Sequence, residues 1–178
     1  LVAEQGRAPV ALQQLDKATW RAECADGIPL VVRYRVYAFD TSVRAAFLDA
    51  TRGFFNGTAL CLRVEGREQA AHALAVVGLP AGWDVATSLD ALPGGSGHDF
   101  VAADYDALVD HPVELGRFVR TRFDVAGVAH ELVVAGALPD FDGDRFAADV
   151  ARICAAEVRF RHGDGKPPFD RYVFLLNA

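Results

Sequence analysis

The pair His130-Glu131 comes nearest to a known catalytic motif. In a zinc-binding HExxH helix, two histidines one turn apart hold the metal and the glutamate activates a water molecule. In this chain the position of the second histidine is occupied by Val134. The flanking residues also alternate as in a strand, which would turn the two side chains to opposite faces. The sequence therefore predicts no metal site at this pair.

Three aspartates at positions 140, 142 and 144 have the alternate spacing of a calcium-binding loop. The loop would need glycine where Arg145 stands and a bidentate glutamate where Ala151 stands. A helix that begins after an acidic lead-in explains the same residues, with Asp144 as its cap. We expect a helix start here and no bound calcium.

Residues 104–116 carry four carboxylates in thirteen positions: Asp104, Asp106, Asp110 and Glu114. Pro112 excludes helical geometry from the residue before it, so a helical turn over residues 105–109 must stop there. Two interpretations stay open. The segment is either a capped, solvated connector or the lining of a cleft between two domains, where Asp110 or Glu114 would offer negative charge to a ligand.

Glu114 is the stronger substrate-binding candidate, because a strand starting near Leu115 would hold it in place. Asp110, by contrast, can be used to cap the preceding turn. If Glu114 offers its charge to a cationic group of a substrate, its replacement by Gln should lower kcat/KM by about 10-fold or more. The alternative is an ion pair between Glu114 and a nearby arginine such as Arg117 or Arg120.

Composition excludes several classes of partner. The net charge is −6, and no cluster of Lys or Arg is present to neutralise phosphates, so we expect no nucleic-acid partner. No apolar run approaches the roughly 20 residues that span a bilayer, so we expect no membrane partner. The cysteines, Cys24, Cys61 and Cys154, show no CxxC spacing and favour a reducing compartment.

Residues 1–112 are typical of a β-sandwich domain, with short apolar runs between turn residues. The pattern predicts a hairpin of residues 19–24 and 28–40 across Asp26-Gly27. It predicts a second tight turn at Asn56-Gly57 followed by a strand, and a hairpin of residues 72–77 and 83–87. Between the sheets we expect three large aromatic side chains to be largely buried: Phe54, Phe55 and Trp83.

Residues 113–178 have a different pattern. Alternating strands over 118–125 and 129–135 flank Ala126-Gly127 and predict another hairpin. A helical apolar stripe follows and ends near His162-Gly163. The apolar run 172–176 is typical of an interior strand covered on both sides. The fold class we expect is mainly β with an α+β tail, and the domain boundary lies between residues 112 and 113.

Five segments resemble the amino-terminal region of the glycyl aminopeptidases, the PDZ-containing zinc metallopeptidases of family sixty-one. In order along the chain, these segments are YRVYAFD at 34–40 followed by SVR at 42–44, RGFFNGT at 52–58, GW at 82–83 with ATS at 86–88, DYD at 104–106 with DHPVE at 110–114, and PFDRYVFLL at 168–176. Together they span most of residues 19–177. A single segment would be weak evidence, but five in the right order identify the family.

The resemblance implies a longer parent protein with a β-sandwich domain, a thermolysin-like catalytic domain and a PDZ domain. Residues 113–178 would be the first hairpin, helix and strand of that catalytic domain. The family's zinc helix and its Gly-Gly-x-Glu-His segment lie beyond these residues, so no catalytic residue or zinc ligand is carried onto this chain. The resemblance also implies that the first strands of the sandwich precede Leu1.

We therefore expect a non-catalytic part of a zinc aminopeptidase, inactive alone, that walls the cleft for peptide substrates. Its partners would be the catalytic and PDZ domains of the same polypeptide, and zinc would be the cofactor of the parent only. The alternative is an interaction or assembly module that uses exposed β edges. A cytoplasmic location is favoured, and a periplasmic one would follow if a signal peptide had been removed.

Overall fold

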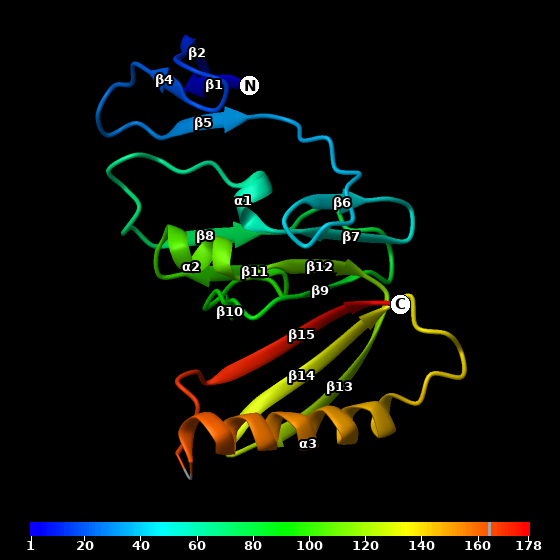
Figure 1. The fold of residues 1–178 in the computed structure, drawn as a ribbon. Helices are drawn as coiled ribbons and strands as arrows, with labels where there is room; N and C mark the ends of the chain where they lie inside the picture. The colour runs from blue at the N-terminus through cyan, green and yellow to red at the C-terminus, as the bar shows by residue number, and fades with distance from the viewer. Residues whose placement is uncertain (164) are drawn as a thin grey trace. The chain divides into compact units, whose positions relative to one another are not determined.

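The computed structural model describes residues 1–163 and 165–178, and it divides into two compact units, Leu1–Tyr37 and Ala38–Ala178 (Figure 1). Strands predominate in both units, and a 20-residue helix lies near the carboxyl end of the second. The mainly β fold with an α+β tail is confirmed.

The first unit contains two small sheets. One has the order β2-β1-β5, with bounds Ala8–Val10, Val2–Gln5 and Leu30–Arg33, and the other pairs β3 (Leu12–Gln14) with β4 (Trp20–Ala22). The hairpin predicted across Asp26-Gly27 is wrong, because β4 pairs with β3 and β5 pairs with β1. The Gln5 amide instead holds the intervening loop, donating to the carbonyls of Ala25 (2.9 Å) and Ile28 (2.7 Å).

The second unit begins with a sandwich of two sheets. A four-stranded sheet has the order β6-β7-β12-β9, with bounds Ala46–Leu48, Arg52–Phe55, Val113–Gly116 and Asp84–Ala86. A three-stranded sheet has the order β10-β11-β8, with bounds Asp90–Ala91, Asp99–Ala102 and His72–Ala75. The strand β12 begins just after the predicted boundary at residue 112 and pairs with β7 and β9. The boundary stays a prediction.

Two turn predictions in the sandwich are wrong. Asn56 begins the short helix α1 (Gly57–Leu60), because its side chain accepts a 3.0 Å bond from the Thr58 amide and so caps a helix. The strands β8 and β9 do not form a hairpin, since β8 pairs with β11 and β9 pairs with β12. The helix predicted before Pro112 is present as α2 (Tyr105–Asp110), and His111 after it is extended.

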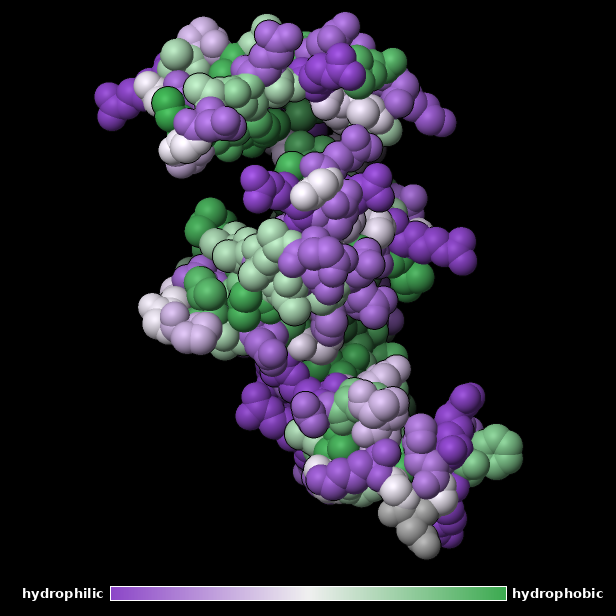
Figure 2. All heavy atoms as spheres, turned by 90° about the vertical axis from the view of Figure 1, so that its left-hand side faces the viewer, coloured by the Kyte–Doolittle hydropathy of each residue, from purple (hydrophilic) through white to green (hydrophobic). Residues whose placement is uncertain are grey.

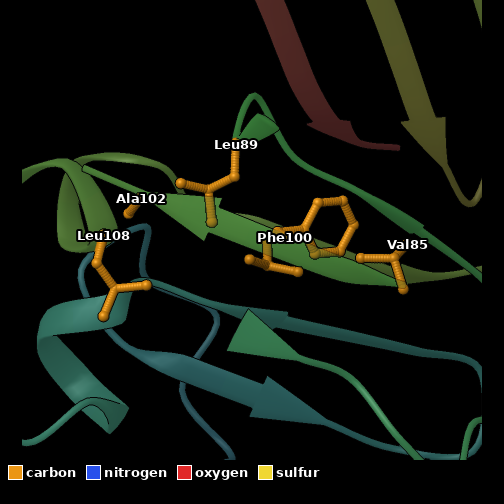
Figure 3. Packing of buried hydrophobic residues seen from close by; sticks show 6 residues of the cluster. Val85, Leu89, Phe100, Ala102 and Leu108 are labelled. Atoms are coloured by element: carbon orange, nitrogen blue, oxygen red, sulfur yellow. The ribbon is translucent and has the colours of Figure 1, made fainter. Parts of the chain in front are cut away.

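The core of the sandwich lies between its two sheets and α2 (Figure 3). Its buried hydrophobic residues come from β9, β11, β12, α2 and the segment after β9: Val85, Leu89, Phe100, Ala102, Leu108 and Val113. Phe54 is buried as predicted, with 9% exposure. Phe55 and Trp83 are partly buried, and Phe55 packs against this core.

The carboxyl-terminal module consists of the hairpin β13 (Phe118–Val125) and β14 (Val128–Ala135), the helix α3 (Gly143–His162) and the strand β15 (Arg171–Asn177). The hairpin is confirmed, and Ala126 and Gly127 in its turn have φ of 54° and 73°. The helix is also confirmed, but its cap is Asp142, which accepts a bond from the Arg145 amide, and not Asp144.

The strand β15 pairs in parallel with β14 and lies at one edge of the order β13-β14-β15. Its central residues are half-buried, so the interior position predicted from its apolar run is wrong for this structure. On one face of β15, Tyr172 and Phe174 line a groove together with residues of α3. On the other face, Arg171 donates to the carbonyl of Leu89 in the sandwich.

Register separates the side chains of this sheet. Phe123, His130 and Tyr172 lie side by side on the face that carries α3, because they are paired across β13, β14 and β15. The neighbouring positions Arg122, Glu131 and Val173 project from the opposite face.

The described residues include no helix that is long and apolar enough to cross a membrane. On the face shown in Figure 2, hydrophobic and hydrophilic side chains are interspersed.

Candidate functional site

Glu114 lies on β12, the strand between β7 and β9, and is 1% exposed. Its two carboxylate oxygens accept from Arg52, with 2.9 Å to Nε and 2.9 Å to Nη2. The guanidinium of Arg52 also lies over the ring of Phe47, 5.5 Å from its centroid. This paired, two-point geometry is the strong form of an arginine–carboxylate contact. The partners expected from the sequence, Arg117 and Arg120, are wrong, because strand pairing brings in an arginine 62 residues earlier.

Asp110 is the last residue of α2 and is exposed. It does not cap the helix, since Asp104 does so by accepting a 2.7 Å bond from the Ala107 amide. Asp110 lines an open groove of about 680 Å³ with eight other residues: Arg44, Asn56, Thr58, Asp104, Asp106, Ala107, Val109 and His111. Glu114 is not among these lining residues. The two predicted substrate-binding carboxylates therefore lie in different surroundings, one accessible and one enclosed.

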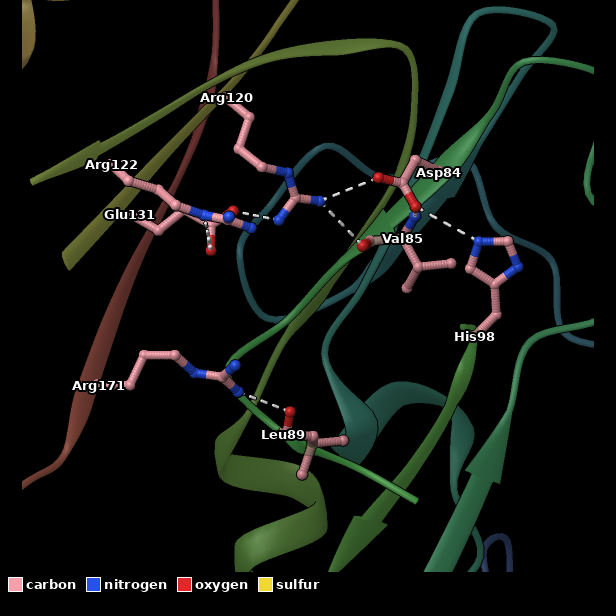
Figure 4. Close-up of polar contacts among 8 residues, drawn as sticks. All are labelled: Asp84, Val85, Leu89, His98, Arg120, Arg122, Glu131 and Arg171. Carbon is pink, nitrogen blue, oxygen red and sulfur yellow. Dashed lines mark hydrogen bonds and ion pairs between the residues drawn. The ribbon is translucent and has the colours of Figure 1, made fainter. Parts of the chain in front are cut away.

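A polar network joins the sandwich to the carboxyl-terminal sheet (Figure 4). Its centre is Arg120 on β13, which donates from Nη2 to Asp84 Oδ2 (3.1 Å) and to the carbonyl of Val85 (3.2 Å). The other amino group of Arg120, Nη1, donates to Glu131 on β14. One guanidinium thus connects β9, β13 and β14.

The network continues beyond Arg120. Asp84 Oδ1 lies 3.3 Å from Nε2 of His98, and Glu131 Oε2 lies 3.8 Å from Nε of Arg122. Partial burial alone would raise the pKa of Asp84. The Val85 amide, the charge of Arg120 and the contact with His98 outweigh that effect and lower this pKa. The Asp84 carboxylate is thereby favoured in its charged form.

Arg171, the first residue of β15, makes a second connection on the same face of the sheet. Its Nη2 donates to the carbonyl of Leu89 at 2.6 Å, and Leu89 is part of the sandwich core (Figure 4). Sequence reasoning missed both Arg120 and Arg171 as junction residues. The sequence signal that could have identified Arg120 is the alternation of charged and apolar residues along β13. The charged residues then share one face of the strand, and that face is expected to meet polar groups.

His130 and Glu131 have the opposite orientations that the strand pattern predicts. The His130 side chain is 3% exposed, stacks between Phe123 (5.2 Å) and Tyr172 (5.9 Å), and its Nδ1 lies 2.9 Å from the Val128 carbonyl. Glu131 turns to the junction. Within residues 1–163 and 165–178, no group of three or more His, Cys, Asp or Glu side chains is placed to hold a metal ion. The residues present do not fit a zinc site.

Comparison with known proteins gives two positive results. Residues 1–117 match the family model of the Peptidase M61 N-terminal domain. The whole fold is similar to the crystal structure of an aminopeptidase N family protein from Idiomarina loihiensis, with a TM-score of 0.90 and 35% sequence identity. That similarity covers 99% of this chain but 30% of the solved chain. No curated protein matches the sequence.

Proposed function

Because the chain belongs to the Peptidase M61 N-terminal domain family, we propose that it forms the non-catalytic amino-terminal part of a zinc-dependent aminopeptidase and walls the substrate cleft of that enzyme. The similarity to an aminopeptidase N family protein over almost the entire chain supports this proposal. The chain spans less than a third of that solved protein, so most of the enzyme would lie outside residues 1–178.

The reaction would be the hydrolysis of amino-terminal residues from peptides, with glycine or alanine preferred. Bound zinc would supply a polarised water molecule as the nucleophile. The ligands would come from a catalytic domain of the same polypeptide, since the described residues here offer no such set. A PDZ domain is the further partner that the sequence resemblance implies.

The role of this chain would be to hold the first strands of the catalytic domain in place. The observation that carries this role is the junction centred on Arg120, which binds β9 of the sandwich and β14 of the following sheet at once. Arg171 adds a contact from β15. Because the side chains that make these bonds lie on one face of the β13-β14-β15 sheet, the bonds fix the orientation of that sheet relative to β9. An active-site wall needs this kind of rigid support.

The binding of the substrate ammonium by Asp110 or Glu114 stays a prediction. Asp110 has the accessible carboxylate, whereas both oxygens of Glu114 already face Arg52. We therefore expect Asp110→Asn to lower kcat/KM for free-amine substrates if a carboxylate of this segment meets the ammonium. A lower kcat/KM in Glu114→Gln would be evidence that Glu114 recognises the substrate ammonium only if the variant is shown to be folded.

The proposal is tested with the longer gene product and with residues 1–178 alone. The longer protein should hydrolyse glycyl and alanyl amides, lose this activity with a zinc chelator, regain it with zinc, and reject substrates whose amine is acetylated. The shorter chain should bind no stoichiometric zinc and hydrolyse none of them. An inactive, zinc-free longer protein would contradict the proposal and favour the alternative, an assembly module that pairs through exposed strand edges.

A further inference from the structure

The chain passes from the sandwich to the carboxyl-terminal module through a single residue. The strand β12 ends at Gly116 and β13 begins at Phe118, so only Arg117 lies between the two sheets along the chain. Gly116 has a φ of 143°, which favours glycine, and a Cβ there would lie 3.3 Å from the carbonyl oxygen of Thr51. A corner of one or two residues at the ends of strands is the kind of position that absorbs a hinge rotation.

The two regions on either side of this corner have separate cores. Among the described residues, the sandwich core and the hydrophobic side chains that pack against it come from positions 55–115. Leu132 on β14 and Ala147 on α3 are buried inside the module, with 1% and 5% exposure. Regions that do not share a hydrophobic core are expected to move relative to one another unless other contacts hold them together.

Three arginines of the module hold it against one segment of the sandwich, residues 81–89. Each donates from Nη2 to a main-chain carbonyl, and the three acceptors are four residues apart: Arg117 to Ala81 at 3.1 Å, Arg120 to Val85 at 3.2 Å and Arg171 to Leu89 at 2.6 Å. The last two contacts are drawn in Figure 4. We call these three contacts the arginine latch.

The latch joins fixed acceptors to movable donors. Val85 and Leu89 are 6% and 3% exposed, so their carbonyls are held by the core of the sandwich. The donors stand at the ends of long side chains, and a hydrogen bond to an uncharged acceptor can be exchanged for one to water at modest cost. The segment is also shaped for arginine, because Gly82 has a φ of 80° and a Cβ there would lie 3.0 Å from Nη2 of Arg117. Such contacts can form and break while both regions stay folded.

We propose that Gly116 and Arg117 form a hinge, that the arginine latch holds it closed, and that the module swings away from residues 81–89 when the latch opens. The structure holds the closed state, since Val133, the partner of Arg120 in the β13-β14 pairing, is 0% exposed. This inference rests on the proposed function, in which the chain walls a substrate cleft. Opening would widen that cleft for the entry and release of peptides, and closure would restore the wall.

The experiment measures the distance between the two regions in residues 1–178 and needs no catalysis. Spin labels are attached to cysteines introduced at Ala73 on β8 and Ala155 on α3, both exposed, after the three natural cysteines have been replaced by serine. Pulsed electron paramagnetic resonance should give one narrow distance distribution for the closed latch. The double variant Arg120→Gln/Arg171→Gln should broaden it about two-fold or add a second population, because Arg117 is then the only part of the latch that remains.

Arg122→Gln is the matched control. Arg122 lies on the same face of the sheet and is 74% exposed, but its contact, 3.8 Å from Nε to Glu131, stays inside the module. Its replacement removes the same charge and should leave the distance distribution unchanged. In the longer protein, the double variant should lower kcat about 10-fold with its zinc content unchanged, because the wall is closed for less of the time. Arg122→Gln should keep the natural kcat.

Two results would overturn the inference. Equally narrow distributions in the natural chain and the double variant would show that the joint is rigid without the latch. Equal broadening in Arg122→Gln would assign the effect to charge and not to the bonds with residues 81–89. If the double variant loses its cooperative unfolding in urea, Arg171→Gln alone replaces it, and a narrow distribution from that variant counts against the hinge. An inactive longer protein whose residues 1–178 show the expected broadening would contradict the proposed function and leave the hinge standing.

Discussion

The sandwich and the module of β13, β14, β15 and α3 bury their apolar side chains in different ways. In the sandwich, Phe100 and its neighbours are enclosed between two sheets and a helix, all supplied by residues 38–116. In the module, β14 is buried, but Ile153 and Phe160 on α3 remain exposed. The first region closes its own core, whereas the second leaves apolar side chains of α3 exposed to solvent. Local stability should therefore be concentrated in the sandwich.

The largest effect is expected in the sandwich core. Phe100 is 8% exposed and packs among Val85, Leu89 and Leu108 (Figure 3). Phe100→Ala should reduce the free energy of unfolding by about 3 to 5 kcal/mol, because it removes buried apolar area and leaves a cavity. Urea unfolding followed by tryptophan fluorescence gives this value. A loss below about 1 kcal/mol would mean that the core is not closed as described.

A smaller loss is expected from Glu114→Gln. The substitution leaves the Arg52 guanidinium without its charged partner, and the Arg52 side chain is only 15% exposed. Glu114→Gln should therefore lower the free energy of unfolding by about 2 to 3 kcal/mol. Asp110→Asn is the control, since Asp110 is exposed, and should stay within about 0.5 kcal/mol. Equal stabilities of the two variants would show that the buried ion pair does not stabilise β12.

The junction between the two regions should contribute less, and in a pH-dependent way. The pKa of Asp84 is lowered in the folded chain, so its contribution is present above the unfolded value near 4 and is lost as pH falls through the folded value. Its side chain is 58% exposed, so the contribution should stay below about 1 kcal/mol.

The measurement compares the pH dependence of Tm for the natural chain and for Asp84→Asn from pH 7 to pH 2. The two curves should be separated at neutral pH and meet at the acidic end. Asp90→Asn, at an exposed position of the sandwich, is the control and should follow the natural chain. Curves that stay parallel down to pH 2 would show that Asp84 does not act through its charge.

The smallest effect is expected on α3. In residues 1–178 alone, Phe160→Ala should change the free energy of unfolding by no more than about 0.5 kcal/mol, because the ring is 86% exposed. Urea unfolding gives this value too. A loss above about 1 kcal/mol would show that the ring is buried, and the contrast between a closed sandwich and an open module would then disappear.

Sequence reasoning succeeded where the determining contacts are local. The turn residues and the alternating pattern of the β13-β14 hairpin lie within 18 consecutive positions. The apolar stripe of α3 and the glycine at its carboxyl end, Gly163, are likewise local to the helix. It failed where remote strands decide the outcome. The pairing of β9 with β12 and of β8 with β11 depends on which sheet each strand joins, and no turn residue encodes that choice.

The candidate site shows the same limit. The sequence singled out Glu114, but the identity of its partner, Arg52, depends on the register of β7 against β12. Trp83 was expected to be largely buried between the sheets; the strand β9 begins only at Asp84, and the Trp83 side chain is partly buried. Replacement of Trp83 by Ala should therefore cost less than the 3 to 5 kcal/mol typical of a fully buried ring.

The connection from β14 through α3 to β15 also has a kinetic consequence. The hairpin of β13 and β14 closes across two residues, whereas β15 can pair with β14 only after the intervening chain, including all 20 residues of α3, has folded back. Short closures are faster than long ones, and parallel pairing is slow to form. The amides of β15 should therefore gain protection from hydrogen exchange after those of the hairpin, so that β15 is the last strand to join its sheet.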